Sequence, residues 1–220
     1  MLASSPTRPD AVLFDCDGVL VDSEPIADRI LVENFARYGF EIDVAEVHTL
    51  FAGGTMKGAG EEAKRRGAAM PENWLDEIYD ELLGALALGT PIIPGIRDLL
   101  DRLDAAGIPY AIGSNGAPRK MEITLGQNDL LERFEGRIVS AHVLGRAKPD
   151  PGVYLEAARI LGVDPAQTVV IDDSPSGVRA GVAAGARVLG YAPHSDADRL
   201  RSLGAEVFFD MAEVPDLIGL

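Results

Sequence analysis

The fold is decided by AVLFDCDG at residues 11–18, where an apolar run passes directly into two aspartates and a glycine. A continuous apolar run that ends at a turn is typical of a strand buried in a parallel sheet. Asp15 and Asp17 are two residues apart, and alternate residues of an extended chain point to the same side. We therefore predict that both carboxylates face the crevice beyond the strand ends, where open parallel sheets bind ligands. Gly18 then allows the chain to turn away.

Five later runs resemble the first and are also predicted to be strands. They are PYAIG at 109–113, RIVS at 137–140, TVVI at 168–171, RVLG at 187–190 and the weaker AEVFF at 205–209. Residues 95–106 and 151–161 have helical spacing, and each stretch is followed by a helix-ending glycine. This alternation predicts an α/β fold, with a Rossmann-like parallel sheet core and helices on both faces.

The stretch from residue 23 to residue 88 interrupts the alternation, because it shows helical spacing throughout and no convincing strand. Apolar residues such as Ile30, Leu31 and Phe35 recur at the spacing of one helix face. We predict a core domain made of residues 1–22 and 90–220, with a helical domain of residues 23–89 inserted after the first strand.

Composition limits the partners and the compartment. The net charge of −15 repels phosphate backbones, so nucleic acid is not expected as a partner. Cys16 is the single cysteine, which excludes an intrachain disulfide and fits a reducing compartment. No apolar run reaches membrane-spanning length, and the first residues lack the apolar segment of a signal peptide. We expect a soluble, cytoplasmic monomer without a membrane partner.

Polar residues at other strand ends could complete a site with the first aspartates. Asp172 and Asp173 follow the run at 168–171, and two acidic strand ends in one sheet can meet around a divalent cation. Prolines at 149 and 151 restrict the backbone around Lys148, so this lysine could neutralise a phosphoryl oxygen. Ser114 and Asn115 end the run before a predicted helix, a place suited to an anion.

These four segments, in this order, resemble the signature of the haloacid dehalogenase superfamily. The matching segments are DCDGVLVDSE at 15–24, SNG at 114–116, KPDP at 148–151 and DDSPSG at 172–177. The insert resembles the four-helix (C1-type) cap of that superfamily. The chain looks most similar to its beta-phosphoglucomutase-like members and sugar-phosphate phosphatases, including 6-phosphogluconate phosphatase-like enzymes.

The resemblance implies a magnesium-dependent reaction on a small phosphate ester. Asp15 would attack phosphorus and become an aspartyl-phosphate. Asp17 would protonate the leaving alkoxide and then accept a proton from the attacking water. Ser114, Asn115 and Lys148 would bind the phosphoryl oxygens.

The resemblance also implies a ligand set for the magnesium ion. The ion would be held by the Asp15 carboxylate, the Asp17 backbone carbonyl and Asp173. Asp172 would orient a water molecule bound to the ion.

Departures from the family pattern favour one activity within the superfamily. Asp17 favours phosphate esters, because dehalogenases and phosphonate hydrolases of this fold lack the second aspartate. Phosphomutases carry a Ser-Arg pair where this chain has Thr55 and Met56, and a hinge histidine where it has Ala27. We therefore expect a phosphatase that acts on a sugar or sugar-acid phosphate. A beta-phosphoglucomutase-type mutase and a non-catalytic binding protein remain alternatives.

The cap loop is expected to contribute substrate selectivity. Thr55 and Lys57 are the candidate contacts there. Gly53 and Gly54 would let the backbone approach the ligand.

Overall fold

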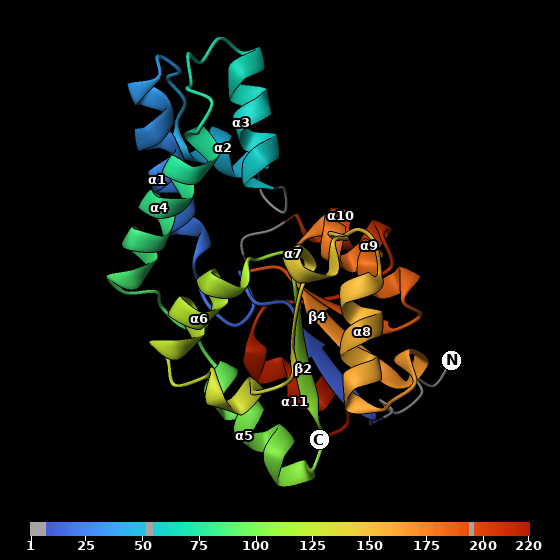
Figure 1. Ribbon diagram of the computed structural model, residues 1–220. Coiled ribbons are helices and arrows are strands. Elements are labelled where there is room, and N and C mark those ends of the chain that lie inside the picture. Colours follow the sequence, from blue (N-terminus) through green and yellow to red (C-terminus); the bar gives the residue numbers. More distant parts are fainter. Residues whose placement is uncertain (1–7, 52–54, 194–195) are drawn as a thin grey trace.

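The computed structural model describes residues 8–51, 55–193 and 196–220 and contains one six-stranded parallel sheet (Figure 1). Its strands are β1 (Ala11–Phe14), β2 (Tyr110–Ser114), β3 (Ile138–Ser140), β4 (Thr168–Asp172), β5 (Arg187–Tyr191) and β6 (Glu206–Phe208). Each predicted strand is confirmed to within one residue at either end. The strand order is β3-β2-β1-β4-β5-β6, so the chain reverses its direction of travel across the sheet between β1 and β4. Ligands bind beside such a reversal in open α/β sheets.

Helices cover both faces of the sheet because successive strand residues point to opposite sides. Val12 and Phe14 belong to one buried cluster with α5 (Ile96–Ala106), α6 (Pro118–Gly126) and α11 (Val214–Leu217). Leu13, between them, belongs to a second cluster on the other face. The helices of that face are α8 (Gly152–Leu161), α9 (Pro175–Ala183) and α10 (Ala197–Ser202), while the short α7 (Ala141–Leu144) follows β3. The prediction of helices on both faces is therefore confirmed.

Four helices between β1 and β2 form a helical lobe, as Figure 1 shows, consistent with an inserted cap. The lobe consists of α1 (Glu24–Arg37), α2 (Val44–Phe51), α3 (Met56–Arg65) and α4 (Trp74–Ala87). Its buried apolar residues form a cluster of their own, separate from the two clusters at the sheet. Trp74 stacks on Phe35 with ring centroids 5.8 Å apart and donates to Asn34 Oδ1 at 2.6 Å.

Two chain segments connect the lobe to the sheet, and they lie side by side. The Asp22 amide donates to the Pro91 carbonyl at 2.8 Å, and Val21 bridges to Ile92. Near the end of α4, Gln127 Nε2 donates to the Leu86 carbonyl at 2.8 Å. The lobe is thus tied to the core close to α6. None of the helices in the described ranges combines the length and apolar character needed to cross a lipid bilayer.

Candidate active site

Three aspartates meet where β1 and β4 end. One carboxylate oxygen from each of Asp15, Asp172 and Asp173 lies within 4.8 Å of the other two. Asp15 is 9% exposed and Asp172 is fully buried. The carboxyl ends of neighbouring parallel strands lie at the same edge of a sheet, which is why two segments far apart in sequence converge here. The two acidic strand ends therefore come together as predicted.

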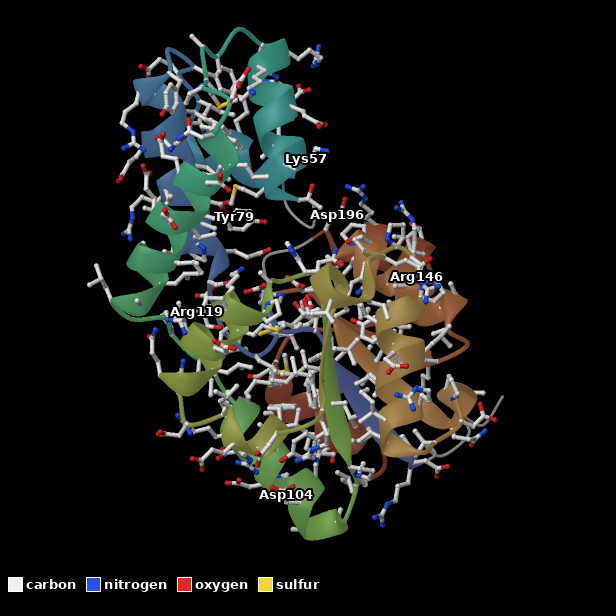
Figure 2. The ribbon with its side chains drawn as sticks, viewed as in Figure 1. Lys57, Tyr79, Asp104, Arg119, Arg146 and Asp196 are labelled. Carbon is white, nitrogen blue, oxygen red and sulfur yellow. The ribbon has the colours of Figure 1, made fainter. Side chains whose placement is uncertain are left out.

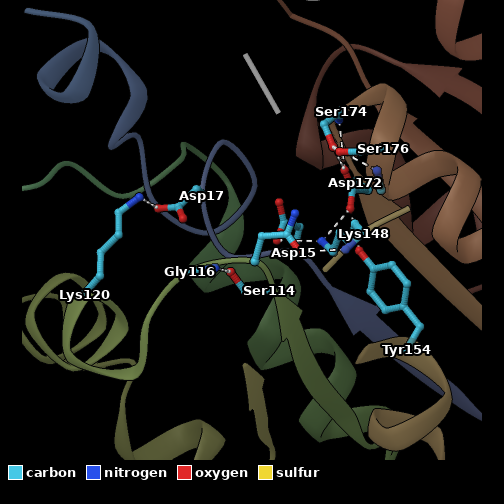
Figure 3. A network of polar contacts seen from close by, with 12 residues as sticks. Asp15, Asp17, Ser114, Gly116, Lys120, Lys148, Tyr154, Asp172, Ser174 and Ser176 are labelled. Atoms are coloured by element: carbon cyan, nitrogen blue, oxygen red, sulfur yellow. Dashed lines mark hydrogen bonds and ion pairs between the residues drawn. The ribbon is translucent and has the colours of Figure 1, made fainter. Parts of the chain in front are cut away.

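Lys148 lies between two of these carboxylates (Figure 3). Its Nζ is 2.8 Å from Asp15 Oδ1 and 2.8 Å from Asp172 Oδ2, and its side chain is 2% exposed. Burial alone would lower the pKa of Lys148, but the two carboxylates outweigh burial and raise it. The lysine is therefore a fixed positive charge, and the prolines at 149 and 151 that follow it restrict the backbone there.

Both carboxylate oxygens of Asp172 are already engaged by protein groups. Oδ2 accepts from Lys148 and from the Tyr154 hydroxyl, while Oδ1 accepts from the Ser174 amide at 2.9 Å and its hydroxyl at 2.8 Å. Gly177 permits this arrangement, because a Cβ there would stand 1.7 Å from Asp172 Oδ2. Asp172 is therefore fixed in orientation by its surroundings.

Asp173 and Asp15 remain as the carboxylates that could hold a cation. Burial raises the pKa of Asp173 well above its usual range, and the charges of Glu24, Asp172 and Asp15 raise it further. Burial also raises the pKa of Asp15 to about 7, with Lys148 opposing and Asp172 adding to the shift. A divalent cation would relieve this repulsion, and magnesium prefers oxygen ligands. The donor set thus fits a magnesium ion.

Gly18 brings the loop after β1 against Asp173. Its φ of 76° lies in the left-handed region, and a Cβ there would stand 2.2 Å from Asp173 Oδ2. Only glycine meets both conditions without strain. The sharp turn predicted at Gly18 is present and keeps residues 15–18 next to the second acidic pair.

Asp17 lines the same pocket as Asp15, but its carboxylate turns toward the first turn of α6 (Figure 3). Oδ1 is 2.8 Å from Lys120 Nζ and accepts from the Ser23 hydroxyl at 2.5 Å. Burial would raise the pKa of Asp17, but the charge of Lys120 and the two hydrogen bonds outweigh burial and lower it. Asp17 is thus held as an anion in this arrangement.

Ser114 and Asn115 line the pocket at the end of β2. Ser114 Oγ accepts from the Gly116 amide at 2.9 Å. Asn115 Oδ1 accepts from the Lys148 amide at 2.8 Å and so ties the lysine loop to this strand end. Both residues lie beside the carboxylates, as their place in the sequence predicts.

Of the candidate substrate-binding residues of the lobe that the structure describes, one lines the pocket and one does not. Thr55 lines the pocket, and its hydroxyl also accepts from the Gly58 amide at 3.1 Å to cap α3. Figure 2 labels Lys57, which lies on α3. Its side chain is exposed and 3.8 Å from Glu61 on the same helix, and it does not line the pocket. Gly53 and Gly54 lie outside the described residues.

Several further residues of the site did not emerge from the sequence. Among them are Ser23, Lys120 and Tyr154. A signal existed for Lys120, because a cation in the first turn of a helix opposes the helix dipole and therefore suggests an acidic partner. Tyr154 carried no such signal, since it lies on the apolar face of α8 like any core residue.

Known proteins resemble the chain over almost its whole length. A family model described as haloacid dehalogenase-like hydrolase matches residues 9–185. The chain is 28% identical over 213 residues to 6-phosphogluconate phosphatase of Escherichia coli, covering 96% of this chain and 95% of that protein. It is 32% identical over 200 residues to hexitol phosphatase A of the same organism, covering 89% of each.

A solved structure shows the same likeness. A HAD family hydrolase from Deinococcus radiodurans R1 with bound phosphate and sodium is 36% identical and superposes with a TM-score of 0.79. The match covers 96% of this chain and 94% of that chain.

Proposed function

Because the chain belongs to the haloacid dehalogenase-like hydrolase family, we propose that it is a magnesium-dependent phosphatase of a small sugar or sugar-acid phosphate. One observation carries this proposal. A buried carboxylate, Asp15, lies beside a fixed lysine and a second acidic strand end, on a pocket that also exposes Asp17. Relatives named as 6-phosphogluconate and hexitol phosphatases support the substrate class.

In the first step, an oxygen of Asp15 attacks phosphorus and the bond from phosphorus to the leaving alkoxide breaks. An aspartyl-phosphate results. Lys148 is suited to neutralise a phosphoryl oxygen because its charge is fixed within 2.8 Å of the nucleophile. Ser114 and the backbone around Asn115 offer hydrogen bonds to the same phosphoryl group. In the second step, water attacks the aspartyl-phosphate and releases inorganic phosphate.

Asp17 is proposed to move the proton in both steps. It must carry a proton when the alkoxide leaves and be ionised when water attacks. The pairing with Lys120 and Ser23 stabilises the ionised form, which suits the second step. The first step requires this pairing to loosen, and closure of the lobe over the substrate is the movement that could loosen it.

Magnesium is proposed to be held by the Asp15 carboxylate, the Asp17 backbone carbonyl and Asp173. Asp172 orients this set indirectly, because its own oxygens are engaged by Lys148, Tyr154 and Ser174. When bound, the ion would supply positive charge to the phosphoryl oxygens and to the crowded carboxylates.

The helical lobe is proposed to act as a four-helix C1-type cap, with its boundaries near residues 23 and 89. Its connectors run side by side, as in a hinge. Thr55 would contact the leaving group. Met56 and Ala27 line the pocket and offer no charge for a second phosphate, so the mutase reaction is disfavoured.

Phosphate release from a panel of sugar and polyol phosphates tests the proposal. We expect turnover with Mg²⁺ and none after chelation. Asp15→Asn should lower kcat about 10⁴-fold or more, because no covalent intermediate can form. Asp98→Asn, an exposed change on α5, is the matched control and should leave the rate unchanged. Interconversion of a hexose 1-phosphate and 6-phosphate without net release would instead establish a mutase.

A further inference from the structure

A groove of about 1100 Å³ runs along the outer edge of the sheet, beside β3. Its walls come from α6, β3, α7, α8 and the short helix η1 (Glu132–Phe134). α6 and η1 cover one face of the sheet and α7 and α8 cover the other, so they form the two flanks of the groove (Figure 1). No described residue lines both this groove and the candidate active site.

Main-chain groups of β3 point into the groove. β3 stands at the end of the strand order, so no described strand pairs with its outer side. The Ile112 amide of β2 donates to the Arg137 carbonyl at 2.9 Å. Because successive residues of a strand direct these groups to opposite sides, the amide and carbonyl of Ile138 point away from β2. An unpaired strand edge of this kind can accept a further strand from another chain.

The flank formed by α7 and α8 is apolar and exposed. Val143 of α7 is 79% exposed, Ile160 of α8 is 37% exposed, and Leu144 is half-buried. All three line the groove. Glu156 on the same flank is neutralised by Arg159 at 2.6 Å. Exposed apolar side chains that gather at one place, with polar residues around them, mark a contact surface.

The flank formed by α6 and η1 is acidic. Glu122, Glu132 and Glu135 line the groove there. Glu122 pairs with Arg119 at 3.2 Å. Glu132 and Glu135 are exposed, and their carboxylates pair with no cation in the part of the chain that the structure describes.

The arginines next to these two glutamates in the sequence are engaged elsewhere. Arg133 pairs with Asp101 at 2.7 Å and with Asp104 at 2.5 Å. Arg137 lies over the Tyr110 ring, 5.0 Å from its centroid. One flank of the groove therefore carries negative charge that its neighbours leave unneutralised, and the other flank offers apolar surface.

We propose that this groove binds an extended, basic segment of another protein, which adds a strand to the sheet beside β3. Side chains alternate between the faces of a strand, so the segment alternates basic and apolar residues. Its basic side chains meet Glu132 and Glu135, and its apolar side chains pack on Val143 and Ile160. A second copy of this chain does not fit, because its net charge of −15 would repel the same groove.

The peptide KVKVKVK, with an N-terminal fluorescein and a C-terminal amide, is the probe, and fluorescence anisotropy measures its binding. We expect saturable binding that weakens as salt is added, because salt screens charge attraction. The charge-reversed peptide EVEVEVE should bind about tenfold more weakly or worse. Of two N-methylated forms of the basic peptide, at the valines or at the internal lysines, one should bind about tenfold more weakly than the other, because only one set of amides faces β3.

Charge reversal on the protein tests the acidic flank. Glu132→Lys combined with Glu135→Lys should weaken binding of the basic peptide about tenfold or more. Glu33→Lys combined with Glu41→Lys is the matched control, because it changes the net charge equally at exposed positions of the lobe. Binding by this control should stay close to that of the wild-type protein.

Val143→Ser tests the apolar flank and should weaken binding several-fold. Val44→Ser, at a valine of α2 that is 50% exposed, is its control and should leave binding unchanged. Circular dichroism checks the folding of each variant. Phosphate release should keep its wild-type rate in all of them, because none of these residues lines the catalytic pocket.

Equal binding of the basic and acidic peptides, or equal effects of the two double substitutions, would overturn the inference, since overall charge would then account for the attraction. Lack of saturable binding by the wild-type protein would overturn it as well. Equal binding of the two methylated forms would overturn the addition of a strand. A dimer in light scattering that Val143→Ser dissociates would place a second copy in the groove and refute a basic partner. Each of these outcomes leaves the proposed phosphatase function standing.

Discussion

The sheet-end site and the helical lobe are built on different principles. At the sheet end, ionisable groups are buried and each is fixed by another, as Lys148 is between Asp15 and Asp172. In the lobe, apolar packing around Trp74 and Phe35 gives the shape, and the charged side chains lie outside. The difference suggests a division of work, in which the sheet end performs the chemistry and the lobe selects the leaving group.

The comparison predicts that replacing a lysine at the sheet end lowers stability and the reaction rate far more than replacing a lysine on the lobe. Lys148→Met would leave buried carboxylates without their partner, so the free energy of unfolding without Mg²⁺ should fall by about 3–5 kcal/mol. The rate should fall about 10³-fold, the loss expected for a main electrostatic contact to the reacting group. Urea unfolding and phosphate release measure the two effects.

Lys57→Met is the matched control on the lobe. This side chain is 75% exposed, so its loss should leave stability and rate close to those of the wild-type protein. Similar losses in the two variants would show that the supposed division between the regions does not exist.

Two helical glycines allow the same substitution in each region. Gly177→Ala places a Cβ 1.7 Å from Asp172 Oδ2, and the resulting displacement of the carboxylate should lower kcat/KM about 10²-fold. Gly60→Ala places a Cβ 2.3 Å from the Trp74 ring, and overpacking should destabilise the lobe by about 1–3 kcal/mol.

The readouts of the two glycine variants should differ. With a small aryl phosphate, Gly60→Ala should retain kcat near the wild-type value, and with a larger sugar phosphate it should raise KM. Gly177→Ala should lower kcat for both substrates. Loss of kcat in the Gly60 variant with the aryl ester would mean that the lobe takes part in the chemistry itself.

The sheet-end site could be predicted well from the sequence because short stretches of sequence determine its strands and their ends. An apolar run followed by acidic residues fixes a strand and its end, and parallel strands bring such ends to one edge. The meeting of Asp15 with Asp173 follows from this. The orientation of Asp17 toward Lys120 does not, because it depends on how α6 packs against the loop after β1.

The helices of the lobe could be predicted from the sequence, but the side chains that the lobe presents to the pocket could not. Helical spacing identifies Leu31 and Phe35 as apolar positions, yet it cannot say that Leu31 also reaches the pocket. Lys57 illustrates the limit, since its nearness to Thr55 in sequence suggested a substrate contact and it lies outside the pocket. Which lobe residues face the pocket depends on the angles at which the four helices pack. No local sequence pattern encodes these angles.

The smallest expected effect concerns metal binding and pH. The pKa of Asp15 is about 7 in the folded protein without metal, against 3.8 for a free carboxyl. Between these values the folded state holds a proton that the unfolded state has lost, so the contribution of Asp15 to stability declines as pH rises. Magnesium competes with that proton, and its stabilising effect should therefore grow over the same range.

The increase in Tm caused by Mg²⁺ should thus be near zero at about pH 5 and reach about 2–4 °C at about pH 7.5. Comparing samples with and without Mg²⁺ at each pH cancels the contributions of titrating groups away from the metal, and Asp15→Asn should weaken the pH dependence of the difference. Asp173, whose pKa is also raised, would account for the dependence that is left. Trp74, the only tryptophan, reports the lobe by fluorescence, whereas circular dichroism reports the whole protein. Because the proposed metal ligands belong to the sheet end, a shift confined to the fluorescence signal would contradict the placement of the metal there.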